Sequence, residues 1–226
     1  MIYKICQLIV RTYFNILYKV RVEGRKDIPR NTNFIYAINH RSNNDPPIVS
    51  SYIPGRVAFM AKEELFKNPL LKALITIFGA FPVARGKGDT AVIDTAIDRL
   101  NKGRNLMIFP EGTRSRTGKV GKGHTGAALI AARSGYKIIP VGIIFDEKLS
   151  FRCDITIRFG QPIDPADYCE ICEQPNPRQL VKLKNKYMEE IKKLVYGEEG
   201  EEGFIKRLEE KNAQNEKNAE EESSDE

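Results

Sequence analysis

A histidine and an aspartate five residues apart are the first side chains of this chain with clear catalytic potential. His40 and Asp45 lie in the polar segment Asn-His-Arg-Ser-Asn-Asn-Asp-Pro, which follows an apolar run. A bend through residues 42–44 would return the carboxylate to the imidazole, fix one ring nitrogen as a donor and leave the other as a base. Asp45 also suits the N-cap of a helix that begins at Pro46. The spacing alone leaves both roles open.

A second polar segment, Phe-Pro-Glu-Gly-Thr-Arg-Ser at residues 109–115, has the composition of an anion-binding loop. Gly112 allows the backbone to approach a ligand closely, and the planar guanidinium of Arg114 suits phosphate better than a lysine would. Glu111 fits such a site if it orients an arginine or accepts a hydrogen bond from a substrate hydroxyl. The alternative is an ordinary turn with a solvated arginine. Together with His40, the loop indicates group transfer to a hydroxyl near a phosphate.

Predicted strands precede both segments and can bring them together. Short apolar runs at 33–38 and 105–109 lead into His40 and Glu111. Strand and helix patterns alternate along the chain, which predicts a single α/β domain with a mixed, largely parallel sheet flanked by helices. Ligands gather at the carboxyl ends of strands in such sheets, so we expect both residues at one edge.

Two further residues are associated with predicted strands. Arg85 follows the strand expected at 80–83 and is a second anion-binding candidate, although a lone surface arginine is more often solvated. Pro140 falls within the strand expected at 137–144, where proline has few tolerated places. The remaining predicted strands are 57–60 and 154–159, and the predicted helices are 46–53, 69–78, 89–102, 125–133 and 177–196.

Charge is distributed unevenly over the 226 residues. The formal net charge is +6, and residues 197–226 carry 12 acids and 4 bases, so residues 1–196 carry +14. A body this basic favours acidic lipid headgroups, phosphorylated substrates or nucleic acid. Residues 197–226 have little to bury and are expected to form an acidic, disordered tail. Residues 23–196 then form the α/β domain.

The first 22 residues are expected to form an interfacial helix. Polar residues recur every three or four positions over residues 2–20, and apolar and aromatic residues cover the rest. The segment is too charged and too short to span a bilayer comfortably, but it suits the headgroup region with its cations outward. The alternative is a helix packed on the core of the domain.

The cysteines give no sign of a metal site. Cys169 and Cys172 form a lone C-x-x-C pair, and a structural zinc site would need two more ligands at similar spacing. Cys6 and Cys153 are isolated. We expect four reduced thiols and no bound metal.

Four segments in this order resemble the glycerolipid acyltransferase family, specifically the 1-acylglycerol-3-phosphate (lysophosphatidate) acyltransferases. The segments are 39–46, 79–85, 109–115 and 138–142. The resemblance implies that His40 and Asp45 carry out catalysis and that Pro140 belongs to a block on the acyl side. It also implies that the phosphate and glycerol of the acceptor bind Arg85, Glu111, Gly112, Thr113 and Arg114.

The resemblance further implies a reaction and a location. A fatty acyl group would pass from an acyl thioester, acyl-CoA or acyl carrier protein, to the sn-2 hydroxyl of 1-acylglycerol 3-phosphate, giving phosphatidic acid for phospholipid biosynthesis. No cofactor is expected. The enzyme would lie on the cytoplasmic face of the cell membrane as a peripheral or monotopic protein, against an anionic lipid surface.

Two positions depart from the family pattern and leave the acceptor open. Ala84 stands where relatives often have a polar residue, and His124 where they often have a lysine or arginine. A related acyltransferase that uses glycerol 3-phosphate or another lysophospholipid is therefore an alternative. A non-catalytic protein that binds anionic lipid is a second one. No nucleic-acid partner is expected, because the chain has no aromatic-basic recognition motif.

Overall fold

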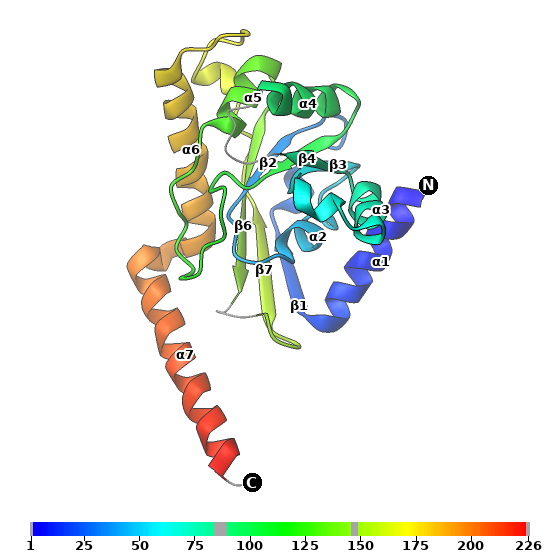
Figure 1. Cartoon of the computed structure of the whole chain (residues 1–226). Coiled ribbons are helices and arrows are strands. Elements are labelled where there is room, and N and C mark those ends of the chain that lie inside the picture. The colour runs from blue at the N-terminus through cyan, green and yellow to red at the C-terminus, as the bar shows by residue number, and fades with distance from the viewer. Residues whose placement is uncertain (1, 84–89, 146–148, 225–226) are drawn as a thin grey trace.

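The computed structural model describes residues 2–83, 90–145 and 149–224. Its centre is a seven-stranded sheet in the order β1-β7-β6-β2-β5-β3-β4 (Figure 1). β6 and β7 pair antiparallel and every other neighbouring pair is parallel, which confirms the predicted mixed, largely parallel α/β sheet. The strands are β1 (Lys19–Glu23), β2 (Ile35–Ile38), β3 (Val57–Lys62), β4 (Ala80–Val83), β5 (Asn105–Ile108), β6 (Ile138–Phe145) and β7 (Asp154–Phe159).

Helices cover both faces of the sheet (Figure 1). One face packs against α4, α5, α6 and the start of α7, and the other packs against α1, α2 and α3. The helices are α1 (Ile2–Leu17), α2 (Asp45–Ser50), α3 (Pro69–Ile77), α4 (Thr90–Asn101), α5 (Gly126–Ser134), α6 (Pro177–Tyr196) and α7 (Gly200–Ser224). A parallel sheet is covered on both faces, which explains why β2 and β6 consist of apolar residues and β5 carries a single polar one, the buried Asn105.

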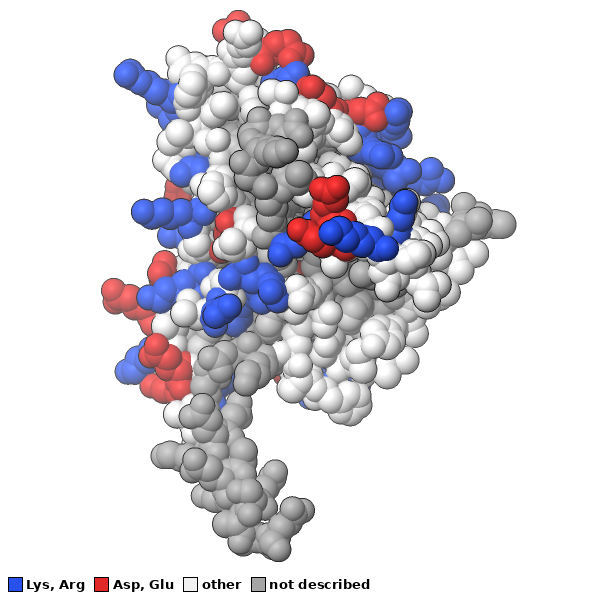
Figure 2. Space-filling model, viewed as in Figure 1, with Lys and Arg blue, Asp and Glu red and all other residues white. Residues whose placement is uncertain are grey.

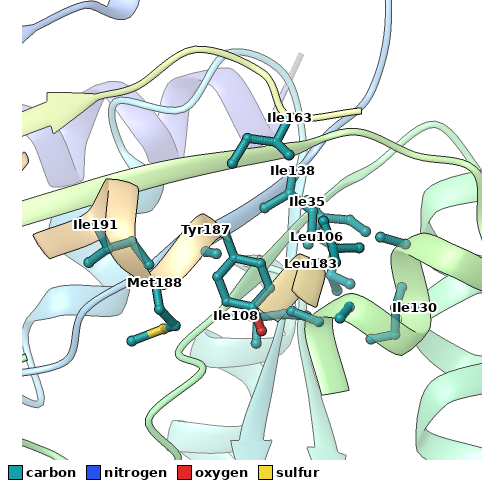
Figure 3. Packing of buried hydrophobic residues seen from close by; sticks show 14 of the residues in the cluster. Ile35, Leu106, Ile108, Ile130, Ile138, Ile163, Leu183, Tyr187, Met188 and Ile191 are labelled. Carbon is teal, nitrogen blue, oxygen red and sulfur yellow. The ribbon is translucent and has the colours of Figure 1, made fainter. Parts of the chain in front are cut away.

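Alternation along the strands divides the core into two hydrophobic layers. Ile35 and Ala37 of β2 point into the layer under α5 and α6, while Tyr36 and Ile38 point into the opposite layer. Figure 3 shows the first layer, where strand residues meet Tyr187 and its neighbours on α6. Each fully buried isoleucine or leucine contributes roughly 1.5–3 kcal/mol through burial.

The register of the two central strands positions the candidate site. β2 and β5 are neighbours and pair in parallel, with Ala37 opposite Ile108. The chain that follows β2 and the chain that follows β5 therefore leave the sheet at the same edge. This places His40 and Glu111 in adjacent loops, as predicted.

The N-terminal segment differs from its expected boundary. The first helix ends at Leu17, and Lys19–Glu23 forms strand β1, which pairs in parallel with β7. The alternating burial of this strand suits an edge position. Residues 19–22 therefore belong to the sheet of the α/β domain and not to the helix.

The polar stripe of α1 packs against the domain, at the end of α2. The amide of Gln7 donates to the carbonyls of Ser50 and Ile53, both at 2.9 Å, and the guanidinium of Arg11 donates to the Ser51 carbonyl. These side chains supply donors to carbonyls at the end of α2, which a helix cannot satisfy internally. The outward face of α1 is apolar, with residues 51% to 62% exposed at Ile5, Leu8, Ile9, Tyr13 and Ile16.

The C-terminal segment also differs from expectation. Residues expected to be disordered continue as α7 from Gly200 to Ser224. The physical reason at its start is a pair of apolar residues one helical turn apart, Phe204 and Leu208, both of which are buried in the core under α6. The composition of residues 197–226, dominated by glutamate, gave no indication that these two residues are buried.

Candidate functional site

The imidazole of His40 is hydrogen-bonded to the carboxylate of Asp45. His40 Nδ1 lies 2.8 Å from Asp45 Oδ2, and the Asp45 side chain is fully buried while that of His40 is 14% exposed. The preceding residue, Asn39, anchors the loop because its amide exchanges two hydrogen bonds with the backbone of Ile143 on β6. With Nδ1 donating to the carboxylate, Nε2 is left with its lone pair and can act as a base.

Asp45 holds the loop around His40 and does not cap the helix. Its Oδ2 also accepts from the backbone N–H groups of Arg41 and Ser42, both at 2.7 Å. The N-cap of α2 is Asn44, which makes no capping hydrogen bond through its side chain. Of the two roles that the spacing left open, the geometry matches the histidine partner.

Glu111 joins the two loops of the site. Its Oε1 accepts a 2.8 Å hydrogen bond from the backbone N–H of His40, and its Oε2 accepts a 2.7 Å bond from the N–H of Gly121. The side chain is buried. Burial raises the pKa of this carboxyl, and the two N–H donors act in the opposite direction. Both oxygens are thus engaged by the protein backbone, an arrangement that sequence reasoning had not found.

Two further contacts join the loop after β5 to His40. The Phe109 ring stacks on the imidazole with centroids 4.2 Å apart and an angle of 30° between the planes. The N–H of Ser115 donates to the carbonyl of His40 at 2.7 Å. Phe109 was missed as a site residue, although its place directly before the Pro-Glu-Gly sequence was a usable signal.

The predicted anion-binding residues occupy the outer part of this loop. Gly112 has a φ of 69°, a conformation that favours glycine, and an added Cβ would lie 3.3 Å from the His124 ring. Thr113 and Arg114 are exposed beside it. His124 is held by its backbone, whose N–H donates to Pro110 and whose carbonyl accepts from a tyrosine hydroxyl of α6.

Two predicted residues are not brought to His40 by the described structure. Arg85 lies outside the described residues. Pro140 is within β6, opposite Ala37 of β2, and its ring lies against the backbone of Gly160. Its carbonyl accepts a hydrogen bond from the Gly160 N–H. The contacts of Pro140 are therefore with the sheet.

An open groove of about 430 Å³ runs up to the loop after β5. Its lining is mostly apolar and comes from β3, β4, α4, β5 and α5. Its lining also includes residues of the loop itself, namely Phe109, Pro110, Gly112 and His124. Among residues 2–83, 90–145 and 149–224, no three histidine, cysteine or acidic side chains cluster so as to hold a metal ion.

Comparison of the sequence with known protein families gives a match that includes the candidate site. The model of the family described as Acyltransferase matches residues 19–144, more than half of the chain. The chain belongs to the acyltransferase family. The matched range contains His40, Asp45 and the loop after β5, so the resemblance inferred from the motifs and the expected class of enzyme are confirmed.

Several known acyltransferases are similar in sequence or structure to this chain. A 1-acyl-sn-glycerol-3-phosphate acyltransferase of Bacillus subtilis is 26% identical over 85% of this chain and 96% of its own length. One from Streptococcus pneumoniae is 33% identical over 71% of this chain and 61% of its own length. The chain spans half or less of several other curated relatives. The crystal structure of a 1-acyl-sn-glycerophosphate acyltransferase from Thermotoga maritima matches with a TM-score of 0.68, 27% identity, and coverage of 84% of this chain and 77% of that one.

Proposed function

We propose that this protein transfers a fatty acyl group from an acyl thioester to the sn-2 hydroxyl of 1-acylglycerol 3-phosphate, giving phosphatidic acid. The observation that carries the proposal is the 2.8 Å hydrogen bond between His40 and Asp45, in a loop that is hydrogen-bonded to the segment 109–115. The similar acyltransferases from B. subtilis, S. pneumoniae and T. maritima are named for this acceptor, which supports the proposal.

In the proposed reaction His40 is the general base. Its Nε2 takes the proton of the acceptor hydroxyl while the oxygen attacks the thioester carbonyl. The tetrahedral intermediate then collapses and the carbon–sulfur bond breaks. The thiolate leaves and takes up the proton that the imidazolium holds. Asp45 keeps the ring in the correct tautomer and stabilises its positive charge. A thiolate is a good leaving group, so direct displacement needs no acyl-enzyme.

The acceptor phosphate would bind the outer part of the loop after β5. Arg114 is exposed there, and its guanidinium can pair with two phosphate oxygens at once. Gly112 lets the backbone approach, Thr113 offers a hydroxyl, and we propose that Arg85 adds a second cation. Holding the phosphate places the sn-2 hydroxyl near His40, and such orientation can supply much of the rate. Glu111 contributes by fixing the loop.

The apolar groove beside this loop suits the acyl chain. Residues of α4 and α5 such as Ile93 and Leu129 line it, and Phe109, which also lines it, stacks on the imidazole of His40. A chain lying in this groove would bring its thioester carbonyl to the position where the acceptor hydroxyl is activated. Whether the thiol belongs to coenzyme A or to an acyl carrier protein is decided by a donor comparison.

We propose that the protein docks on the cytoplasmic face of the membrane through α1. Its exposed apolar face provides side chains for the headgroup region, and Leu70 of α3 is 84% exposed. Figure 2 shows largely uncharged surface over α1, with Lys and Arg gathered elsewhere on the same view. The charge of +14 on residues 1–196 favours an anionic leaflet. No helix among residues 2–83, 90–145 and 149–224 is long and apolar enough to cross a membrane.

An acceptor panel tests the proposed function. The purified protein is given a labelled acyl-CoA, and in parallel an acyl carrier protein thioester, with 1-acylglycerol 3-phosphate, glycerol 3-phosphate and other lysophospholipids. We expect the highest kcat/KM with 1-acylglycerol 3-phosphate. Preference for another acceptor would reassign the substrate. Binding to anionic liposomes without turnover of any acceptor would replace the proposal by the non-catalytic alternative.

A further inference from the structure

The C-terminal helices contact the loop that we assign to the acceptor phosphate. Figure 1 shows the chain between β5 and α5 running beside α6 toward the start of α7. Three side chains of these helices, Tyr196, Phe204 and Leu208, share a buried cluster with Val120 of the loop. All three helical residues lie beyond residues 19–144, the range of the family match.

The first contact is a hydrogen bond between two buried groups. The backbone N–H of Val120 donates to the hydroxyl oxygen of Tyr196 at 2.7 Å. Burial raises the pKa of Tyr196 to about 12, so the hydroxyl stays neutral at physiological pH. A buried N–H without a partner costs roughly 1–3 kcal/mol, so this bond favours the observed position of the loop.

The second contact is made by α7 at a glycine. Gly118 has a φ of 81°, and a Cβ built on it would lie 2.7 Å from the terminal methyl carbon of Leu208. The guanidinium of Arg41, the residue after His40, lies at the same glycine, 3.4 Å from that Cβ position. Leu208 therefore packs directly on the loop where the loop meets the His40 segment. The Phe204 ring supports this arrangement by packing 5.3 Å from the Tyr196 ring.

The contacts continue to the catalytic histidine through the backbone. Val120 is followed by Gly121, whose N–H donates to Glu111 at 2.7 Å. The other oxygen of Glu111 accepts from the N–H of His40 at 2.8 Å. One hydrogen bond to Tyr196 and two to Glu111 thus connect the C-terminal helices with the base.

We propose that Tyr196, Phe204 and Leu208 form a C-terminal clamp that positions the loop 110–124 for catalysis. They are positioning residues, since they touch the loop and not the reacting atoms. This inference rests on the proposed function where it concerns the acceptor, because the clamped loop carries Arg114. Release of the clamp lets the loop move away from His40, so the phosphate is bound less well and the hydroxyl is misplaced.

Hydrogen–deuterium exchange of the full-length protein tests the clamp independently of activity. Tyr196→Phe removes the hydroxyl and keeps the ring, and Leu208→Ala removes the packing on Gly118. Matched controls are Tyr136→Phe, whose hydroxyl bonds the Leu100 carbonyl away from the loop, and Leu180→Ala on α6. We expect exchange of the amides at 118–121 to rise about tenfold in the clamp variants and to stay as in wild type in the controls.

Kinetics of the same variants test the link to catalysis. We expect the KM for 1-acylglycerol 3-phosphate to rise several-fold in Tyr196→Phe and the KM for the acyl donor to stay unchanged. If the clamp variants lose thermal stability but exchange the amides at 118–121 as wild type does, the proposal is contradicted. The start of α7 would then only contribute to the hydrophobic core. If Leu208→Ala fails to fold, Gly118→Ala disturbs the same contact from the side of the loop, because its new Cβ would collide with Leu208. This variant must also raise exchange at 118–121.

The two readouts separate failure of the clamp from failure of the proposed function. A wild-type protein inactive on every acceptor would refute the acyl transfer, while the exchange data would still decide whether the C-terminal helices hold the loop. Raised exchange together with unchanged kinetics in Tyr196→Phe would contradict the positioning role.

Discussion

The backbone N–H of His40 donates a 2.8 Å hydrogen bond to Oε1 of Glu111, a residue 71 positions further along the chain. The other oxygen of the same buried carboxylate binds the N–H of Gly121. This side chain therefore ties the loop after β2, which carries the base, to the loop after β5, which carries the anion-binding residues, beside the Phe109 ring and the Ser115 N–H that also contact His40. Glu111 was expected to meet the acceptor, and its observed contacts make it a brace between the two loops.

Replacing this brace should impair catalysis without direct loss of a substrate contact. In Glu111→Gln one of the two carboxylate oxygens becomes an NH2 group that faces a backbone donor. We expect kcat/KM to fall roughly 10- to 100-fold, because small misplacements of reacting groups are costly. Steady-state kinetics measure this, with Glu64→Gln on the exposed surface as the matched control. Wild-type kinetics in Glu111→Gln would contradict the brace.

The buried carboxylate should also affect the pH dependence of stability. Burial raises the folded-state pKa of Glu111 above its unfolded value. The folded state therefore favours the protonated carboxyl, and the stability that comes from its protonation is fully present below the unfolded pKa and is lost as pH rises through the folded pKa. Urea unfolding of wild type and Glu111→Gln between pH 4 and 7 measures the effect. The stability of wild type relative to the variant should decrease with rising pH, and an increase would contradict the assignment.

Loss of the proposed phosphate ligand should affect one substrate selectively. Arg114→Ala is expected to raise the KM for 1-acylglycerol 3-phosphate by on the order of tenfold or more, since a charge-assisted bidentate contact is lost. Arg114→Lys should recover part of the loss, because a lysine keeps the charge and not the planar fork. The KM for the acyl donor should change little. Equal changes for both substrates would count against this role, and Arg178→Ala on the exposed start of α6 is the control.

The exposed face of α1 should bind lipid. Leu8 and Ile9 are 60% and 62% exposed, so glutamates at both positions should leave the fold intact. We expect the double variant to sediment with anionic liposomes far less than wild type does, since each buried apolar side chain contributes roughly 1.5–3 kcal/mol. Val181→Glu, at a 43% exposed apolar position on α6, is the control. Undiminished binding would place the membrane surface elsewhere.

The sequence predicted the framework of this site well because local patterns determine it. Apolar runs bounded by turn residues gave all the strands of the sheet except β1, and the alternation of strand and helix gave the largely parallel order. His40 and Glu111 follow neighbouring strands, so the general behaviour of parallel sheets brought them to one edge. These predictions needed no knowledge of tertiary contacts.

What the sequence left open depends on contacts between distant segments. Asp45 suits a helix cap and a histidine partner equally well until the loop conformation is known, and Oδ2 at 2.8 Å from the imidazole decides between them. The polar stripe of α1 predicted the helix but not what the stripe packs against, because the carbonyls that Gln7 and Arg11 satisfy lie some forty residues later. The burial of Phe204 depends on Tyr196 and the loop in the same way.

The base function of His40 is the central claim, and one kinetic comparison tests it most directly. Acyl transfer to 1-acylglycerol 3-phosphate is measured for wild type and His40→Ala at equal protein concentration, with circular dichroism to confirm that the variant is folded. Loss of a positioned general base should lower kcat by about 10²–10⁴-fold. Transfer at the wild-type rate by folded His40→Ala would contradict the mechanism.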